Sequence, residues 1–252
     1  MGKRKREHFL RRRGLSEIDF LPERVYSINN INALPRKGSD DFYMFYIPRE
    51  KELLPHLIMR SGETFVDVGA NVGYYSLKIA KEYSTKGVTI LAIEAHPGNY
   101  KALCKNIELN NFKCITTVNK AVSDHKGIVT MYERIDTRNR VRSEFYSLSN
   151  GYIHESNTVR PDAGSLEIEC DTLDNILGEQ RIDVMKIDIE GAEVSALKGA
   201  THILKKLRKI IVEVHGANFD KVMQILNDTN NFRCETIETN LMNYIVGSKL
   251  TN

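Results

Sequence analysis

Two glycines and two carboxylates are spaced so that they could bind a nucleotide-type ligand. Asp67 lies near the end of an apolar run, and Gly69 and Gly73 follow it in a segment that can start a helix. A turn built on glycines lets a ligand approach the backbone closely. Glu94 ends the next apolar run, where an acid can accept hydrogen bonds from ribose hydroxyls. The pattern predicts a cofactor site with an adenosine-like group.

The loop 69–73 favours S-adenosylmethionine over NAD. It lacks the Gly-x-Gly-x-x-Gly pattern, whose extra glycine lets a pyrophosphate rest on a helix. Asp67, just before the loop, would repel a phosphate but suits a ligand that carries an ammonium or sulfonium cation. S-adenosylmethionine has both of these cations and no phosphate. Together with Glu94, the loop therefore predicts this cofactor.

A second group of chemically active residues is expected at the same edge of the sheet. Asp188 ends the apolar run 183–188, and Glu190 lies two residues further on. Glu213 and His215 close another apolar run, and strand alternation puts them on the same side. Methyl transfer to a hydroxyl needs a base, which a carboxylate or a histidine can provide. We predict that Asp188, Glu190 and His215 converge as catalytic residues.

Structural explanations stay open for the same residues. Acidic side chains such as Glu190 and Glu193 stabilise a helix N-terminus, and a histidine at a strand end is often only a hydrogen-bonded structural residue. A divalent cation held by Asp188, Glu190 and His215 is possible on ligand type. Strand-end acids alone are weak evidence for an ion, so the sequence predicts no metal site.

Only an α/β sheet brings these residues together. Apolar runs typical of buried parallel strands alternate with helical patterns from about residue 50 onward. The final two strands are separated by a few residues, which predicts an antiparallel hairpin. The expected strands are 64–68, 88–94, 115–122, 183–188, 209–214, 234–237 and 244–247. The expected helices are 49–60, 97–111, one through 194–207, and 219–226.

Two regions differ from this alternation. Residues 123–170 are the least regular part and follow the third strand, so they are expected to form a substrate lid or a decorative hairpin. Residues 14–48 contain three prolines and predict irregular structure, with at most a strand at 42–47, packed against the main domain. The predicted division is a basic arm and N-terminal extension over 1–48 and a methyltransferase-type α/β domain over 49–252.

Composition agrees with a soluble globular chain. Of 252 residues, 41% are hydrophobic and 27% are charged, which supports one large domain with an ample core. No apolar run approaches the roughly 20 residues of a membrane-spanning helix, and the basic start lacks the apolar segment of a signal peptide. The four cysteines are scattered; without a disulfide or zinc pattern, the expected location is a reducing cytoplasm.

Positive charge is concentrated at the start of the chain. Residues 1–13 hold seven lysines or arginines and one glutamate, whereas the chain as a whole has a net charge of only +3. One interpretation is contact with the phosphates of nucleic acid or with an anionic lipid surface. The other, which we favour for a single short run, is a solvated terminus.

The motifs together resemble the FkbM family of class I S-adenosylmethionine-dependent methyltransferases. The resemblance covers about residues 50–247, and its most specific part is the Asp-x-Glu-Gly-Ala-Glu segment at 188–193. It implies a Rossmann-like fold: a seven-stranded, mostly parallel sheet with a C-terminal antiparallel hairpin and helices on both faces. It also implies O-methylation of a hydroxyl on a sugar, glycan or secondary metabolite. The other matching segments are 62–73, 94–97, 121–124 and 172–174.

The resemblance also implies residue roles. Asp188 and Glu190 match the family's segment near the acceptor. The extension 1–48 falls outside the resemblance, and it leaves the acceptor open because an added arm could redirect the enzyme to a polymer. The implied cofactor-binding residues are Asp67, Gly69, Ala70, Asn71, Gly73 and Glu94, with Ser123 and Asp124 close to the adenine.

Three alternatives remain. A nucleic-acid methyltransferase of the same fold would use residues 1–13 on phosphates, although no Asn-Pro-Pro-Tyr-type segment follows the fourth strand. A non-catalytic binding protein of the same fold is disfavoured by the intact loop, Glu94 and Asp188. An NAD-dependent dehydrogenase is disfavoured by the loop.

Overall fold

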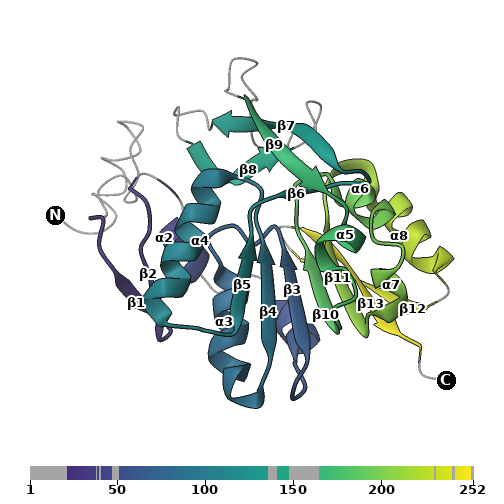
Figure 1. The fold of residues 1–252 in the computed structure, drawn as a ribbon, viewed down its shortest axis with the longest axis horizontal. Coiled ribbons are helices and arrows are strands. Elements are labelled where there is room, and N and C mark those ends of the chain that lie inside the picture. The colour runs from purple at the N-terminus through teal and green to yellow at the C-terminus, as the bar shows by residue number, and fades with distance from the viewer. Residues whose placement is uncertain are drawn as a thin grey trace.

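A seven-stranded sheet is the centre of the molecule. The computed structural model describes residues 22–37, 39, 41–46, 51–135, 141–147, 165–229, 231–239 and 242–250. The sheet has the order β12-β13-β11-β10-β3-β4-β5, in which β13 runs antiparallel to both of its neighbours and the other pairs are parallel (Figure 1). Its strands are β3 (Thr64–Val68), β4 (Thr89–Ile93), β5 (Ile115–Val118), β10 (Val184–Ile187), β11 (Lys209–Val214), β12 (Phe232–Glu238) and β13 (Asn243–Lys249).

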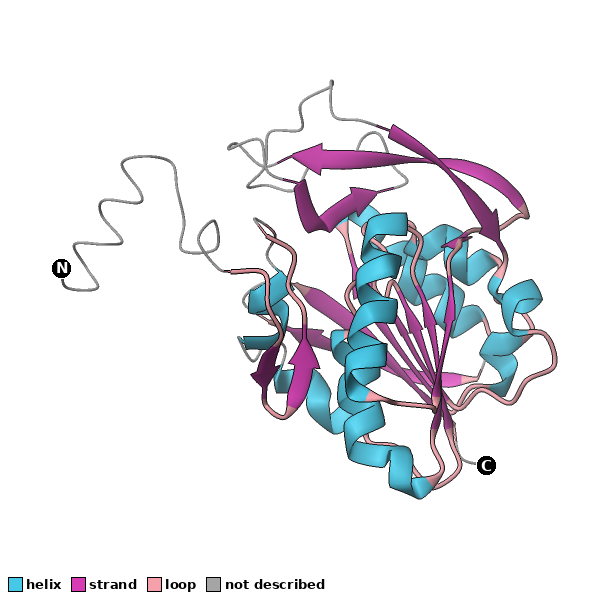
Figure 2. Ribbon diagram, turned by 60° about the vertical axis from the view of Figure 1, so that its left-hand side comes forward, coloured by secondary structure: helices cyan, strands magenta, loops and turns pink. Residues whose placement is uncertain are grey.

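The apolar runs form the central strands because both faces of the sheet are covered by helices (Figure 2). Along β3, Phe65 and Val66 are both fully buried but belong to different hydrophobic clusters, since successive side chains point to opposite faces. The predicted Rossmann-like sheet with its C-terminal antiparallel hairpin is therefore confirmed.

Helices divide between the two faces. One face is covered by η2 (Lys51–Leu57), α3 (Tyr74–Tyr83) and α4 (Pro97–Asn110). The other is covered by α5 (Leu173–Leu177), α6 (Glu193–Lys198), α7 (Ile203–Lys206) and α8 (Phe219–Asp228). Two short turns of 3₁₀ helix, η3 (Ser84–Lys86) and η4 (Gly216–Asn218), complete the helices of this part of the chain.

Two of the predicted helices differ from the structure. The segment expected as a helix over 49–60 is the 3₁₀ helix η2, which contains Pro55, a residue without a backbone N–H. The helix expected through 194–207 is divided into α6 and α7. Asp174 stabilises the start of α7, because its carboxylate accepts hydrogen bonds from the N–H groups of His202 and Ile203.

A second sheet lies over the carboxyl ends of the parallel strands (Figures 1 and 2). The strand expected over 115–122 divides, so that β5 stays in the main sheet while β6 (Ala121–Val122) pairs with β9 (Ser165–Asp171). The order is β6-β9-β7-β8, with β7 (Gly127–Ile135) and β8 (Val141–Ser147). The expected insertion thus contributes three strands, β7, β8 and β9, to a four-stranded sheet, and 136–140 and 148–164 lie outside the described residues.

The N-terminal extension packs on the main domain, as expected. Strands β1 (Tyr26–Ile28) and β2 (Ile31–Ala33) form an antiparallel hairpin. The N–H groups of Asn32 in β2 and of Leu34, just after it, donate to side-chain oxygens on α4. Segment 41–46 forms the helix α2 (Asp41–Tyr46) and is neither irregular nor a strand. The basic arm 1–13 lies outside the described residues. Within the described chain, no helix is long and apolar enough to span a membrane.

An ion pair at the amino ends of β3 and β11 should contribute measurably to stability. Arg208 contacts the buried carboxylate of Glu63 through Nε at 2.6 Å and Nη2 at 2.7 Å. Replacing Arg208 by Met leaves that carboxylate without its cation, so we expect the free energy of unfolding to fall by about 3 kcal/mol. The measurement is chemical denaturation. Lys105→Met, which breaks the exposed Lys105–Glu108 pair, should cost less than about 1 kcal/mol; equal losses would contradict the expectation.

Candidate active site at the carboxyl edge of the sheet

Two strand-end turns meet at the carboxyl edge of the main sheet. Gly69 follows β3 and Asp188 follows β10, and these strands are paired in parallel. The Asp188 N–H donates to the Val68 carbonyl at 3.0 Å. A Cβ on Gly69 would lie 1.8 Å from the Asp188 carbonyl oxygen, so only glycine permits this approach. The glycine loop and the second acidic group are therefore in direct contact.

The glycine loop has a backbone that few residues adopt. Gly69 and Asn71 have φ values of 82° and 51°, a left-handed region favoured by glycine and tolerated by asparagine. The N–H groups of Gly69 and Ala70 both donate to the Ile93 carbonyl at 2.9 Å. These bonds fix the loop to the end of β4, next to Glu94.

Asp67 and Gly73 support the loop from the protein interior. Asp67 is 1% exposed, and its Oδ2 accepts hydrogen bonds from the Ser76 N–H at 3.1 Å and hydroxyl at 2.6 Å. Burial raises the pKa of Asp67, and the nearby Lys186 lowers it. A Cβ on Gly73 would lie 2.7 Å from Leu103 on α4. The cofactor contacts predicted for both residues stay predictions.

Glu94 joins the loop to the start of α4. Its carboxylate accepts hydrogen bonds from the N–H groups of Asn71 at 2.8 Å and His96 at 2.9 Å. The residue is 6% exposed. Burial raises its pKa to about 7, although the hydrogen bonds from His96 and Asn71 lower it. The amide of Asn119 donates to the Glu94 carbonyl at 2.8 Å and holds the strand end in place.

Ser123 and Asp124 lie further along the same edge, after β6. The Ser123 N–H donates to the Asp171 carbonyl at 3.0 Å, and the Ser195 hydroxyl accepts from the Asp124 N–H at 3.2 Å. The hydrogen bond from His125 lowers the pKa of Asp124. These contacts attach both residues to β9 and α6, and their proximity to the adenine stays a prediction.

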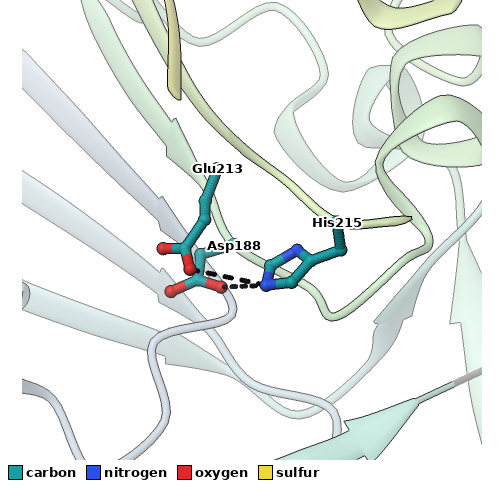
Figure 3. Close-up of side chains that lie close together, drawn as sticks. All are labelled: Asp188, Glu213 and His215. Carbon is teal, nitrogen blue, oxygen red and sulfur yellow. Dashed lines mark ion pairs between the residues drawn. The ribbon is translucent and has the colours of Figure 1, made fainter. Parts of the chain in front are cut away.

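The structure brings Asp188, Glu190 and His215 together, as the sequence predicts. The ring nitrogen Nε2 of His215 lies 4.0 Å from Asp188 Oδ1 and 3.8 Å from Glu190 Oε2. Glu213 is on the same side and its Oε1 lies 3.4 Å from the same nitrogen. In Figure 3 the carboxylates of Asp188 and Glu213 lie side by side in front of the ring. On the other side of the ring, Nδ1 lies 2.8 Å from Glu193 Oε1.

His215 does not fit the role of base that the sequence suggests for it. Burial alone would lower its pKa, but hydrogen bonds with Glu193 and Glu213 and the charges of Glu190 and Asp188 raise the pKa to about 12. These contacts favour the protonated form of the ring, so His215 is poorly suited to take a further proton as a base. Burial and the charge of Asp188 raise the pKa of Glu213 to about 7. Of the predicted groups, Glu190 and Asp188 remain available as proton acceptors.

Sequence reasoning gave no role to two residues that hold this group. Lys186 lies 2.9 Å from Asp188 Oδ2 and 4.6 Å from the centre of the Tyr75 ring. A lysine inside an otherwise apolar strand was a usable signal, because a buried charge needs a partner. The Tyr244 hydroxyl donates to Glu213 Oε2 at 3.0 Å. Nothing in the sequence indicated this role for Tyr244, because only the sheet order places β13 beside β11.

Comparison with known proteins identifies the family. The profile described as the methyltransferase FkbM domain matches residues 67–234, more than half of the chain, and includes the glycine loop, Glu94 and the segment 188–193. The chain belongs to the FkbM methyltransferase family. This membership implies S-adenosylmethionine as the cofactor, which agrees with the prediction from the loop.

Individual relatives are distant. The chain is 28% identical over 211 residues to the 31-O-demethyl-FK506 methyltransferase FkbM of Streptomyces tacrolimicus, covering 75% of this chain and 78% of that protein. It is 24% identical over 143 residues to Methyltransferase 1 of Beauveria bassiana, covering 53% and 57%, and thus spans little more than half of that relative. The crystal structure of methyltransferase FkbM from Methylobacillus flagellatus shares the fold, with a TM-score of 0.54 at 19% identity, covering 79% and 46%.

A pair of glycine substitutions can test the contact between the two turns. Gly69→Ala introduces a Cβ that meets the Asp188 carbonyl, whereas Gly87→Ala, at a similar positive φ of 71°, introduces one into open space. Gly87→Ala should lower the free energy of unfolding by about 1–2 kcal/mol, the cost of the left-handed backbone. Gly69→Ala should cost about 1–3 kcal/mol more through overpacking. Equal losses in chemical denaturation would show that the turns can separate freely.

Proposed function

We propose that the protein is an S-adenosylmethionine-dependent O-methyltransferase acting on a hydroxyl of a sugar, glycan or secondary metabolite. The observation that carries this proposal is the direct contact between the glycine loop and the Asp188 turn in a chain of the FkbM family. The name of the Streptomyces tacrolimicus relative specifies a 31-O-demethyl substrate, which supports an oxygen acceptor here.

The residues at this edge fit the cofactor chemically. Glu94 offers a buried carboxylate beside the loop, suited to accept hydrogen bonds from ribose hydroxyls. The Asp67 carboxylate, just before the loop, suits the cationic methionine end better than a phosphate. When bound, S-adenosylmethionine supplies an electrophilic methyl group. Asn71 and Gly69 adopt the left-handed conformation of the loop, and Gly69 has no side chain to hinder the close approach of a ligand to the backbone.

Glu190 is the proposed base. It has a φ of 51°, an uncommon conformation for a residue with a side chain and one that is often found at functional sites. Its side chain is 19% exposed and can therefore meet an acceptor from solvent. As a carboxylate it can accept the proton that the hydroxyl loses during transfer. Asp188, anchored by Lys186, contributes mainly to the orientation of the acceptor.

The other interpretations have less support. The nucleic-acid methyltransferase depends on residues 1–13, which lie outside the described residues, and the family assignment disfavours an NAD-dependent dehydrogenase. A non-catalytic protein would bind S-adenosylmethionine without turnover. We therefore propose calorimetric titration with S-adenosylmethionine, S-adenosylhomocysteine and NAD as the first test. Binding of NAD alone would contradict the proposal, and so would the absence of S-adenosylhomocysteine release with every hydroxyl acceptor in a broad panel.

Glu94→Gln should weaken binding of S-adenosylhomocysteine by about tenfold or more, because a charged acceptor for ribose hydroxyls is lost. The affinity of the unmodified protein should also rise with pH. Its free Glu94 carboxyl has a pKa of about 7 and must lose its proton to act as a charged acceptor, so binding at pH 6 should be roughly tenfold weaker than above pH 8.

Calorimetry from pH 6 to 8.5 measures both effects. Glu94→Gln should flatten the pH profile, because no carboxyl remains to titrate. Glu108→Gln, an exposed substitution on the same helix, is the matched control and should leave affinity and profile unchanged. If Glu94→Gln binds S-adenosylhomocysteine as tightly as the unmodified protein does, the proposed role of Glu94 in cofactor binding is wrong.

Glu190→Gln should slow methyl transfer by about 10²–10⁴-fold, the usual contribution of a positioned base. Its affinity for S-adenosylhomocysteine should change little, since the substitution affects the acceptor side. The measurement is release of S-adenosylhomocysteine with an acceptor found in the panel, compared with calorimetry on the same variant. A full rate of transfer would exclude Glu190 as the base.

A further inference from the structure

We infer that Asp188, Glu213 and His215 form a binding site for one divalent cation of the Mn²⁺ type. Each residue offers one ligand atom, and the three atoms lie within 4.8 Å of one another. They come from the ends of the adjacent strands β10 and β11, and Figure 3 shows that the two carboxylates and the ring face one another. The inferred binding stands without the proposed function, but the role given below to the ion rests on it.

Each ligand residue is anchored on the side away from the proposed ion. Asp188 uses Oδ2 to bind Lys186 at 2.9 Å, while Oδ1 faces His215. Glu213 uses Oε2 to accept the Tyr244 hydroxyl at 3.0 Å, while Oε1 faces His215. One oxygen of each carboxylate is thus oriented toward a common point. Rigid orientation of this kind is what a metal site requires of its ligands.

The histidine has the supporting contact typical of metal ligands. Its Nδ1 lies 2.8 Å from Glu193 Oε1, and a carboxylate on one ring nitrogen commonly orients the other nitrogen toward a metal. Glu193 is itself fully buried and is held by the Gly191 N–H at 2.8 Å and the Asn218 amide at 3.0 Å. With the proton kept on Nδ1, Nε2 faces the two carboxylates as a ligand.

The charge balance of the group favours a cation at this point. Four carboxylates surround His215, and Lys186 pairs with one of them, that of Asp188. Buried carboxylates require compensating charge. A divalent ion held by Asp188, Glu213 and His215 would supply two positive charges among these carboxylates.

The donor set indicates the class of ion. Carboxylate oxygens suit Mg²⁺ and Mn²⁺, and an imidazole nitrogen suits the transition metals, so the mixed set favours Mn²⁺ over Mg²⁺. The Asp188 side chain is 27% exposed, which leaves one side accessible to a substrate. A metal there would bind the acceptor hydroxyl as a Lewis acid and lower its pKa, while Glu190 removes the proton. In this step the hydroxyl proton passes to Glu190. The acceptor oxygen forms a bond to the methyl carbon while the bond between that carbon and the cofactor sulfur breaks.

The test is titration of the chelator-treated full-length protein with Mn²⁺. Electron paramagnetic resonance measures the concentration of free ion at each step. We expect one Mn²⁺ per chain, with at least tenfold weaker binding in Glu213→Gln and in His215→Gln. Tyr244→Phe removes only the outer anchor of Glu213 and should weaken binding about 10–100-fold. Glu108→Gln removes one exposed carboxylate and should bind as the unmodified protein does. Circular dichroism confirms that each variant is folded.

Either of two results would overturn the inference. One is the absence of stoichiometric Mn²⁺ binding, and the other is equal binding by the unmodified protein and the folded Tyr244→Phe and Glu213→Gln variants. The proposed function fails separately. Methyl transfer that continues at full rate in excess chelator would contradict a role of the ion in the reaction and would leave the proposed methyltransferase activity standing. A protein that binds Mn²⁺ but neither S-adenosylmethionine nor S-adenosylhomocysteine would contradict the proposed function and would leave the cation site standing.

Discussion

The contact between the turns after β3 and β10 is the constraint on which the site depends. Parallel pairing of these strands ends both at one level, and Gly69 then passes so close to the Asp188 carbonyl that a side chain is excluded. Because the loop is also hydrogen-bonded to β4, three strand ends are held as one unit. The proposed cofactor residues on one side and the acidic group on the other are therefore fixed relative to each other before any ligand binds.

Buried charge is the second organising feature, and it is balanced locally. The cation of Lys186 and the ring of His215 alternate with carboxylates from β10, β11 and the start of α6. Such a network is costly unless every member has a partner. Its members come from segments that are distant in the chain, so the network also ties the C-terminal hairpin to the carboxyl edge of the sheet through Tyr244.

The second sheet lies over the carboxyl edge of the main sheet, where the proposed site is. It is continuous with the main fold through β6 and α5, and Ser123 at its base is close to Gly199 between α6 and α7. Figure 2 shows this sheet over the carboxyl ends of the parallel strands, the edge at which Glu190 follows β10. We infer that its strands and connections contribute to acceptor choice, in line with the position of the insertion in the sequence.

The sequence by itself determined the sheet, the loop and the three residues that converge, because apolar runs and strand-end acids are local signals with a known place in a parallel sheet. It also indicated Glu94 and the final hairpin. It could not determine that β7, β8 and β9 join β6 in a second sheet, that Asp174 stabilises a separate start for α7, or that four carboxylates surround His215. These outcomes depend on side chains brought together from distant segments. Tyr244 against Glu213 and Glu193 against His215 are such pairs, and long-range contacts of this kind set the charge state and the ligand geometry of the site.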